Sequence, residues 1–241
     1  MIALLENFKI RLSRQLLKIL FISAPESLSN QRYREMLEGL YQSIIDGKSS
    51  KVIVLQEDIS GADFLNFLVA KQDFLFHGSN CTNIDILTPT IQENYRGNEI
   101  NGVFASSDAL WAMFFAIVNR ECYRGSLRNG SFLLRNPDGK SERFYFFSIN
   151  KEMEGKEAWK AGSVYILPRD SFKQTGTGSL RFDEWVSEVP VIPMGKIDIS
   201  PVDFPLLEQV STHDEQESIF LTWLMYKQRL KKKKSSQRIM K

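Results

Sequence analysis

The sequence predicts an α+β fold, and three observations support this prediction. The 241 residues are 43% hydrophobic, which is enough to bury a sizeable core without disulfides or metal ions. Apolar residues recur at helical spacing over residues 1–70, whereas short apolar runs divided by turn signals follow residue 72. A long apolar segment interrupts those runs at residues 109–120. Mostly strands with a few helices is the pattern of an α+β domain.

Residues 1–70 are expected to form a helical N-terminal region. Its apolar residues form two helical stripes, which are Ile2, Leu5, Phe8, Leu12, Leu16 and then Tyr33, Met36, Leu37, Leu40, Ile44. Residues 52–55 predict a short strand, and Ser60 is a suitable N-cap for a further helix that buries Phe64, Leu65 and Leu68. We interpret the region as a helical appendage that could bind a partner.

Residues 71–226 are expected to form the main domain. Its strands should cover residues 74–76, 102–105, 131–134, 143–148, 163–167 and 186–192. Asp108 is a suitable N-cap for a helix over residues 109–120, whose apolar residues lie on nearly all sides and predict a buried helix. The Asn-Pro-Asp-Gly turn at 136–139 predicts a hairpin between residues 132–135 and 143–147.

Residues 227–241 differ in composition from the rest of the chain. They hold eight lysines and arginines and no acidic residue, within a net charge of +2 for the whole protein. Residues 1–226 therefore carry the difference between +2 and +8, a net −6. We expect residues 227–241 to be a basic disordered tail that could contact polyanions.

The cysteine content and hydropathy predict a protein of a reducing compartment without a membrane span. Cys81 and Cys122 are the two cysteines, and neither belongs to a CxxC or Cys/His pattern, so neither a disulfide framework nor a zinc site is expected. No metal is therefore assigned. No apolar run approaches the roughly 20 residues that a membrane helix needs. A cytoplasmic location follows from these expectations.

Two segments in the first half of the main domain carry side chains suited to ligand binding. His77, Gly78 and Ser79 follow the apolar strand 74–76, and a glycine there lets a ligand approach the backbone closely. Phe104, Ala105 and Ser106 end the next expected strand and lead into the apolar helix. Ser107 and Asp108 are equally suited to capping that helix, so Ser106 is the better candidate for ligand binding.

Two further features complete the candidate site. Glu184 and Glu188 stand four residues apart at the two ends of an apolar strand. Tyr95 and Arg96 lie in a polar loop between the first two segments, where they could stack on a ligand, pair with it, or form an ordinary surface turn.

The three strand segments together resemble the signature of ADP-ribosyltransferases of the poly-ADP-ribose-polymerase and diphtheria-toxin branch. That signature has a His followed by Gly and Ser or Thr, a Gly-x-Tyr-Phe-Ala-like strand before a hydrophobic helix, and a Glu that opens a Glu-x-x-Val strand. The corresponding residues here are Leu75-Phe76-His77-Gly78-Ser79, Gly102-Val103-Phe104-Ala105 and Glu188-Val189-Pro190-Val191. The similarity covers about Asp73 to Asp203.

This resemblance implies a split β-sheet domain that uses NAD as a co-substrate. It implies a mono-ADP-ribosyltransferase that transfers ADP-ribose to an unidentified acceptor, either protein or nucleic acid. His77 would hydrogen-bond the adenosine-side ribose, and Gly78 would hold the nicotinamide carboxamide through its backbone. Glu188, or Glu184 in the alternative alignment, would stabilise the positive charge that develops as nicotinamide leaves. Glu188 is ranked first because the valine that follows it matches the family pattern.

Two other functions stay open at this point. One is a catalytically inactive binding or interaction module with the same fold. The other is an RNA 2′-phosphotransferase-like enzyme, because that related group also begins with a His-Gly segment. Such an enzyme needs several arginines to hold a phosphate, and the available candidates are Arg96, Arg120, Arg124 and Arg128.

Overall fold

The computed structural model describes residues 2–25, 33–47, 52–56 and 58–239 of the chain. The helices within these residues are α1 (Ile2–Leu20), α2 (Arg34–Ile45), α3 (Gly61–Lys71), α4 (Ala109–Ile117) and α5 (Ile219–Ile239). The strands are β1 (Ile22–Ser23), β2 (Phe74–Ser79), β3 (Thr90–Glu93), β4 (Glu99–Ala105), β5 (Leu127–Arg135), β6 (Ser141–Asn150), β7 (Gly162–Pro168), β8 (Lys173–Gln174), β9 (Leu180–Phe182), β10 (Trp185–Ser187), β11 (Gly195–Ile199) and β12 (Ser211–His213). The α+β class expected from the sequence is confirmed.

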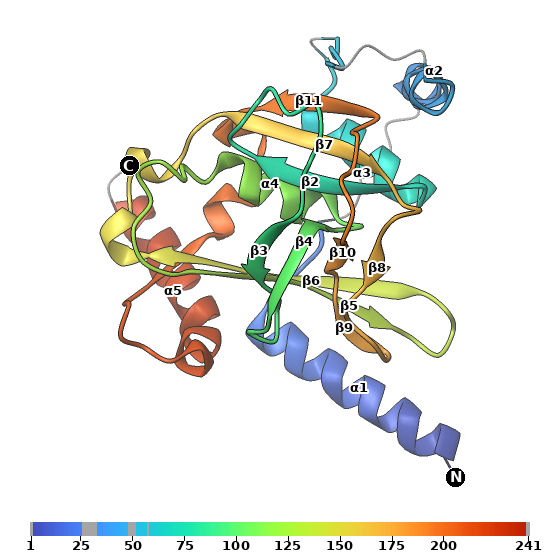
Figure 1. Ribbon diagram of the computed structural model, residues 1–241. Helices are drawn as coiled ribbons and strands as arrows, with labels where there is room; N and C mark the ends of the chain where they lie inside the picture. The colour runs from blue at the N-terminus through green and yellow to red at the C-terminus, as the bar shows by residue number, and fades with distance from the viewer. Residues whose placement is uncertain (1, 26–32, 48–51, 57, 240–241) are drawn as a thin grey trace.

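The strands form three sheets (Figure 1). One has the order β1-β6-β5-β9 with β12 added to β6, the second has the order β3-β4-β10-β8, and the third has the order β11-β7-β2. Figure 1 shows the β11-β7-β2 sheet at the top, the long β5–β6 hairpin at the bottom, and the strands of the second sheet running between them. The hairpin expected around residues 136–139 is confirmed, with Leu133 opposite Arg143 in an antiparallel register.

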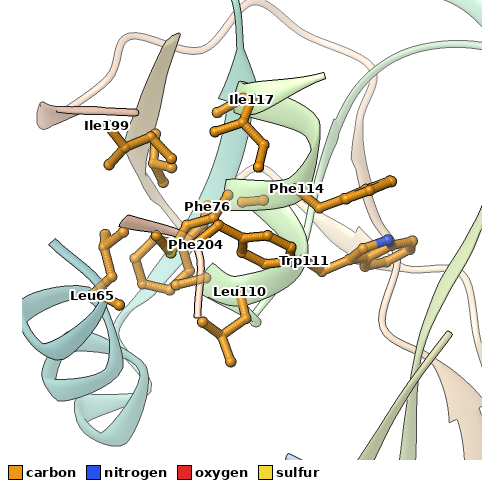
Figure 2. Close-up of a cluster of buried hydrophobic side chains, with 14 of the residues drawn as sticks. Leu65, Phe76, Leu110, Trp111, Phe114, Ile117, Ile199 and Phe204 are labelled. Atoms are coloured by element: carbon orange, nitrogen blue, oxygen red, sulfur yellow. The ribbon is translucent and has the colours of Figure 1, made fainter. Parts of the chain in front are cut away.

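Helix α4 lies at the centre of the largest hydrophobic core (Figure 2). It forms where the sequence predicts it, because the Asp108 side chain accepts a hydrogen bond from the backbone N–H of Leu110 at 3.1 Å and caps the first turn. Phe114 is fully buried, and its ring centre lies 4.6 Å from that of Phe147. The helix ends at Ile117, three residues before the expected end, because Val118 adopts an extended conformation.

Helices α2 and α3 of the N-terminal region pack into the same core as α4, whereas the buried residues of α1 belong to a second core. Buried residues of α2 and α3 that belong to this core are Leu37, Ile44, Phe64, Leu65 and Leu68. Ser60 caps α3 as expected, since its hydroxyl accepts a hydrogen bond from the Asp63 N–H at 3.1 Å. The strand expected at residues 52–55 is reduced to a single bridge between Val52 and Lys196. A boundary at residue 70 would therefore fall between segments that share one hydrophobic core.

The C-terminal basic segment is helical over its described residues and differs in this from the expected disordered tail. Helix α5 runs to Ile239, and most of the basic residues of segment 227–241 lie in its second half. Tyr226 and Leu230 anchor it, because both are buried in a second core that includes Phe146 and residues of α1. The two apolar anchors are one helical turn apart, so one face of a basic helix packs against the protein. Among the described residues, no helix is long and apolar enough to cross a membrane.

Candidate functional site

Two of the sheets meet beside α4, and a pocket of about 410 Å³ opens at the junction. The junction is a pair of backbone hydrogen bonds between strand β2 and the end of β4. The Phe76 N–H donates to the Ser106 carbonyl at 2.8 Å, and the Ser106 N–H donates to the Phe76 carbonyl at 3.0 Å. Of the residues singled out from the sequence, six line this pocket: His77, Gly78, Phe104, Ala105, Ser106 and Glu184.

One ring nitrogen of His77 is hydrogen-bonded to the backbone of strand β4. Its Nδ1 lies 2.7 Å from the carbonyl oxygen of Phe104, which can only accept, so Nδ1 carries the proton. Burial lowers the pKa of His77, although the bond to Phe104 opposes that shift. The side chain is therefore a neutral imidazole at pH 7, and its Nε2 is an acceptor suited to a ligand hydroxyl.

Gly78 is required by close packing between β2 and α4. A Cβ atom at this position would lie 1.8 Å from the carbonyl oxygen of Ala112 and 2.7 Å from the backbone nitrogen of Ala116. These distances exclude every other residue type without movement of the helix. The glycine that the sequence suggested as a point of ligand approach is thus also the point where the helix contacts the strand.

Of the two candidate glutamates, Glu184 is the one that lines the pocket. It precedes β10, which pairs with β4 so that Trp185 lies opposite Ala105, and this register places Glu184 beside the end of β4. Its carboxylate accepts hydrogen bonds from the Thr175 hydroxyl at 2.8 Å and from the Tyr95 N–H at 3.1 Å. Burial raises the pKa of Glu184, and these two hydrogen bonds act against the increase.

Glu188, which the sequence ranked first, lies away from this pocket. The strand expected at residues 186–192 ends at Ser187, and Glu188 is exposed in the turn that follows. The Ser187 hydroxyl donates to the Val189 carbonyl at 3.0 Å and stabilises that turn. Further along, Val191 leaves the sheet and forms a bridge with Leu87. Between the two glutamates, the geometry therefore favours Glu184.

Tyr95 and Arg96 lie at the tip of the β3–β4 hairpin. The ring of Tyr95 stacks on Phe182, with centres 5.2 Å apart and planes 10° apart, while its N–H holds Glu184. Arg96 donates from Nε to the Tyr95 hydroxyl at 2.7 Å. Tyr95 thus does not line the pocket but fixes the position of the Glu184 carboxylate. Arg96 in turn fixes the position of the Tyr95 side chain. Ser79 likewise is not among the pocket-lining residues, and its hydroxyl accepts a bond from the Cys81 N–H.

A network of buried charged residues supports the pocket wall on the side away from the cavity. No role for this network was expected from the sequence. Asp183 is fully buried and forms an ion pair with Arg143, which also lies 3.6 Å from Asp108. Asp183 also accepts hydrogen bonds from the hydroxyls of Ser106 and Ser107. The network therefore ties the end of β4, the start of α4, strand β6 and the residue before Glu184 into one unit.

The two carboxylates of this network differ in pKa. Burial raises the pKa of both, but the Arg143 guanidinium and its hydrogen bond outweigh burial at Asp183, whose pKa is lowered. At Asp108 burial outweighs the attraction of Arg143, so the pKa is raised. Asp183 is accordingly the ionised partner of Arg143. An arginine at the start of an otherwise apolar strand is the signal that could have revealed this network.

Aromatic and charged residues outside the resemblance complete the pocket. Trp111 and Phe115 of α4 line one side, and Glu93 and Arg120 add one negative and one positive charge. Figure 2 shows Trp111 at the end of the core cluster, on the opposite side of α4 from Leu65. Its indole N–H donates to the Asn129 side chain at 2.6 Å, which fixes the ring. Flat apolar walls with a few fixed polar groups suit a ligand that has both a ring and hydroxyls.

The four arginines named for the phosphotransferase alternative do not converge. Arg120 lines the pocket, whereas Arg124 donates to the backbone carbonyls of Glu121 and Tyr123. Arg128 donates to Thr222 and to the Glu217 carbonyl at the start of α5. A phosphate-binding set built from these residues is therefore not present in the pocket.

Comparison with known proteins adds no family to this geometry. No family model, no curated protein and no solved structure matches the chain. Among the described residues, no group of three or more His, Cys, Asp or Glu side chains is placed to hold a metal ion. The pocket itself combines a neutral imidazole, a serine, a partly desolvated carboxylate and aromatic walls.

Proposed function

We propose that the protein consumes NAD in this pocket and transfers ADP-ribose to a macromolecular acceptor, as a mono-ADP-ribosyltransferase-like enzyme. The observation that carries the proposal is the meeting of His77, Ser106 and Glu184 at one pocket from three separate segments of the chain. His77 lies in the first segment of the resemblance to ADP-ribosyltransferases, Ser106 directly follows the second, and Glu184 belongs to the alternative alignment of the third. An α+β domain in which two separate sheets meet at this junction is compatible with the split sheet of that family.

Glu184 takes the role for which Glu188 was first considered. Breaking the bond between nicotinamide and ribose leaves positive charge on the ribose, and a carboxylate held at fixed distance stabilises that charge. The hydrogen bonds from Thr175 and Tyr95 hold the carboxylate in place before the substrate arrives. The charged form is the active one, so the rate should rise with pH through the raised pKa of Glu184.

His77 and the aromatic walls bind the substrate. The Nε2 lone pair of His77 accepts a hydrogen bond from a ribose hydroxyl, and Nδ1 stays bound to Phe104. Trp111 and Phe115 offer apolar faces for a ring of the dinucleotide. The acceptor stays unassigned in this proposal.

The test is nicotinamide release from NAD by the full chain, with and without a cell extract as acceptor. Glu184→Gln keeps the size of the side chain and removes its charge, so release should fall by about 10²–10³-fold. Glu188→Gln is the matched control: it makes the same chemical change at an exposed position four residues away, and it should keep the wild-type rate. Circular dichroism and thermal unfolding would show that both variants are folded.

The opposite ranking of the two variants would overturn the role of Glu184. Equal and undiminished release by both would overturn the mechanism.

A second candidate function is an interaction module, and helix α1 supplies the observation that favours it. Phe8, Leu12, Leu16 and Ile19 recur on its exposed face, and each is more than half exposed. Such an apolar stripe on a soluble surface commonly marks a contact site. Saturable NAD binding by calorimetry without nicotinamide release would favour this module over the enzyme.

A further inference from the structure

A second cavity, separate from the first pocket, gathers four arginines. It has a volume of about 360 Å³ and is lined in part by Arg135, Arg143, Arg169 and Arg181. No acidic residue lines it among the described residues, and its other polar lining groups include Gln72 and Gln174. Four guanidinium groups around one hollow are costly in repulsion unless an anion is present.

Strand register explains how three of these arginines come together. Leu133 of β5 lies between Arg143 of β6 and Arg181 of β9 in one cross-strand row. Arg135 is two residues further along β5 and lies on the same face, opposite Ser141. Arg143, Arg181 and Arg135 therefore project from one face of a single sheet.

The fourth arginine reaches the cavity from the other side. Arg169 follows the end of β7, and its Nη1 donates to the carbonyl of Gln72 at 2.8 Å. Its Cζ lies 4.3 Å from the ring centre of Trp185, so the guanidinium is held over the indole by a cation–π contact. This arginine is fixed in position with further N–H groups left for a ligand.

The charges of three of these arginines are not neutralised by the protein. Arg143 is paired with Asp183, but Arg135, Arg169 and Arg181 form no ion pair with any described residue. The Nε–H of Arg181 is buried and has no hydrogen-bond partner within the described part of the chain. Buried donors are normally satisfied, so a partner beyond the described residues is indicated.

We propose that this cavity binds a phosphate group of a small phosphorylated ligand. Planar guanidinium groups match the oxygens of a phosphate in pairs, and such charge-assisted bonds are the strongest that arginine makes. Arg181 and Arg135 bind the phosphate from the sheet, and Arg169 binds it from the Trp185 side. The volume falls within the range of about 300–1,000 Å³ that small-ligand pockets occupy, so the ligand extends beyond the phosphate itself.

This site does not depend on the proposed NAD chemistry. The first pocket is lined by Ser106 and Glu184, whereas Ser107 and Trp185, their neighbours in sequence, line the arginine cavity. The two hollows thus lie on opposite sides of the same chain segments. A change in one can be made without altering the lining of the other.

The test is isothermal titration of the full chain with two probes, inorganic phosphate and ADP, at constant ionic strength. The first probe measures the bare anion and the second a phosphate carried by a nucleotide. The variants are Arg181→Gln and Arg135→Gln, with Arg11→Gln as the control, since Arg11 is an exposed arginine of α1 outside the cavity.

The expected result is saturable binding of at least one probe, weakened tenfold or more by Arg181→Gln and by Arg135→Gln. Arg11→Gln should bind as the wild type does. Arg135 is exposed at the rim, so its variant keeps the test valid even if Arg181→Gln fails to fold. Absence of saturable binding of both probes would overturn the proposal. So would wild-type affinity in both Arg135→Gln and Arg181→Gln.

Discussion

Acidification should destabilise the protein through His213, one of its two histidines. His213 is buried between two hydroxyls, with Nδ1 at 2.9 Å from Ser148 Oγ and Nε2 at 2.9 Å from Ser126 Oγ. Burial and the nearby Arg128 lower its pKa from 6.5 to about 4, while Glu217 and Glu215 act in the opposite direction. His213 therefore binds a proton less readily in the folded protein than in the unfolded chain.

The size of the effect follows from this pKa difference. At pH 7 the imidazole is neutral in both states and makes little difference to stability. As pH falls below 6.5 the unfolded chain binds a proton at this position and the folded protein does not, so stability is lost until pH reaches about 4. With one pKa unit equal to about 1.4 kcal/mol, the loss amounts to about 2 kcal/mol at pH 5 and approaches about 3 kcal/mol at lower pH.

The assay is urea unfolding at several values between pH 7 and pH 5, on the wild type and on His213→Gln. The glutamine keeps hydrogen-bonding capacity and removes the proton linkage, so the wild type should lose about 2 kcal/mol more than the variant over this range. The comparison cancels His77, whose pKa is also lowered, and Glu184, whose raised pKa acts in the opposite sense. Parallel pH curves for the two proteins, or an NMR titration of His213 centred near pH 6.5, would refute the reasoning.

Two further predictions concern the wall of the first pocket. Gly78→Ala should destabilise the protein by about 3 kcal/mol or more, because its Cβ would meet the Ala112 carbonyl at 1.8 Å. Gly39→Ala, in an open position of α2, should be neutral or stabilising, and equal melting temperatures for the two variants would contradict the packing argument. Asp183→Asn should cost about 3–5 kcal/mol in denaturant unfolding, because it leaves Arg143 as a buried charge without its main partner. A cost below about 1 kcal/mol would mean that Asp183 does not hold the network.

The elements that the sequence predicted well are those with strong local signals. Helix α4 has the N-cap residue Asp108 and an uninterrupted apolar run. The β5–β6 hairpin has an Asn-Pro-Asp-Gly sequence at residues 136–139, and these residue types favour a tight turn. Helix α5 was not predicted from the sequence, and residues 227–241 were expected to be disordered because a run of lysines is typical of disorder. Its stability depends on Tyr226 and Leu230, and the surface that receives them belongs to distant strands.

The candidate site could be predicted as far as its segments, and the structure was needed to select residues within them. Short apolar runs predict the two strands concerned, and His77, within the second half of β2, and Ser106, directly after β4, both reach the pocket. The choice between Glu184 and Glu188 depends on the register of β10 against β4, which no local pattern specifies. Trp111 could not be predicted as a pocket residue for another reason. A helix that is apolar on all sides does not indicate which of its residues faces a cavity.

The contact between α4 and its strands also bears on how readily this pocket could be redesigned. Gly162 of β7 meets the same helix as Gly78, and a Cβ there would lie 2.1 Å from the carbonyl oxygen of Ala116. Main chain touches main chain at both places, so the spacing between helix and sheet does not depend on the size of any side chain. Replacing lining residues such as Phe115 would then alter which molecules fit while the frame keeps its dimensions. The fold thus separates the part that sets the width of the site from the part that sets its selectivity.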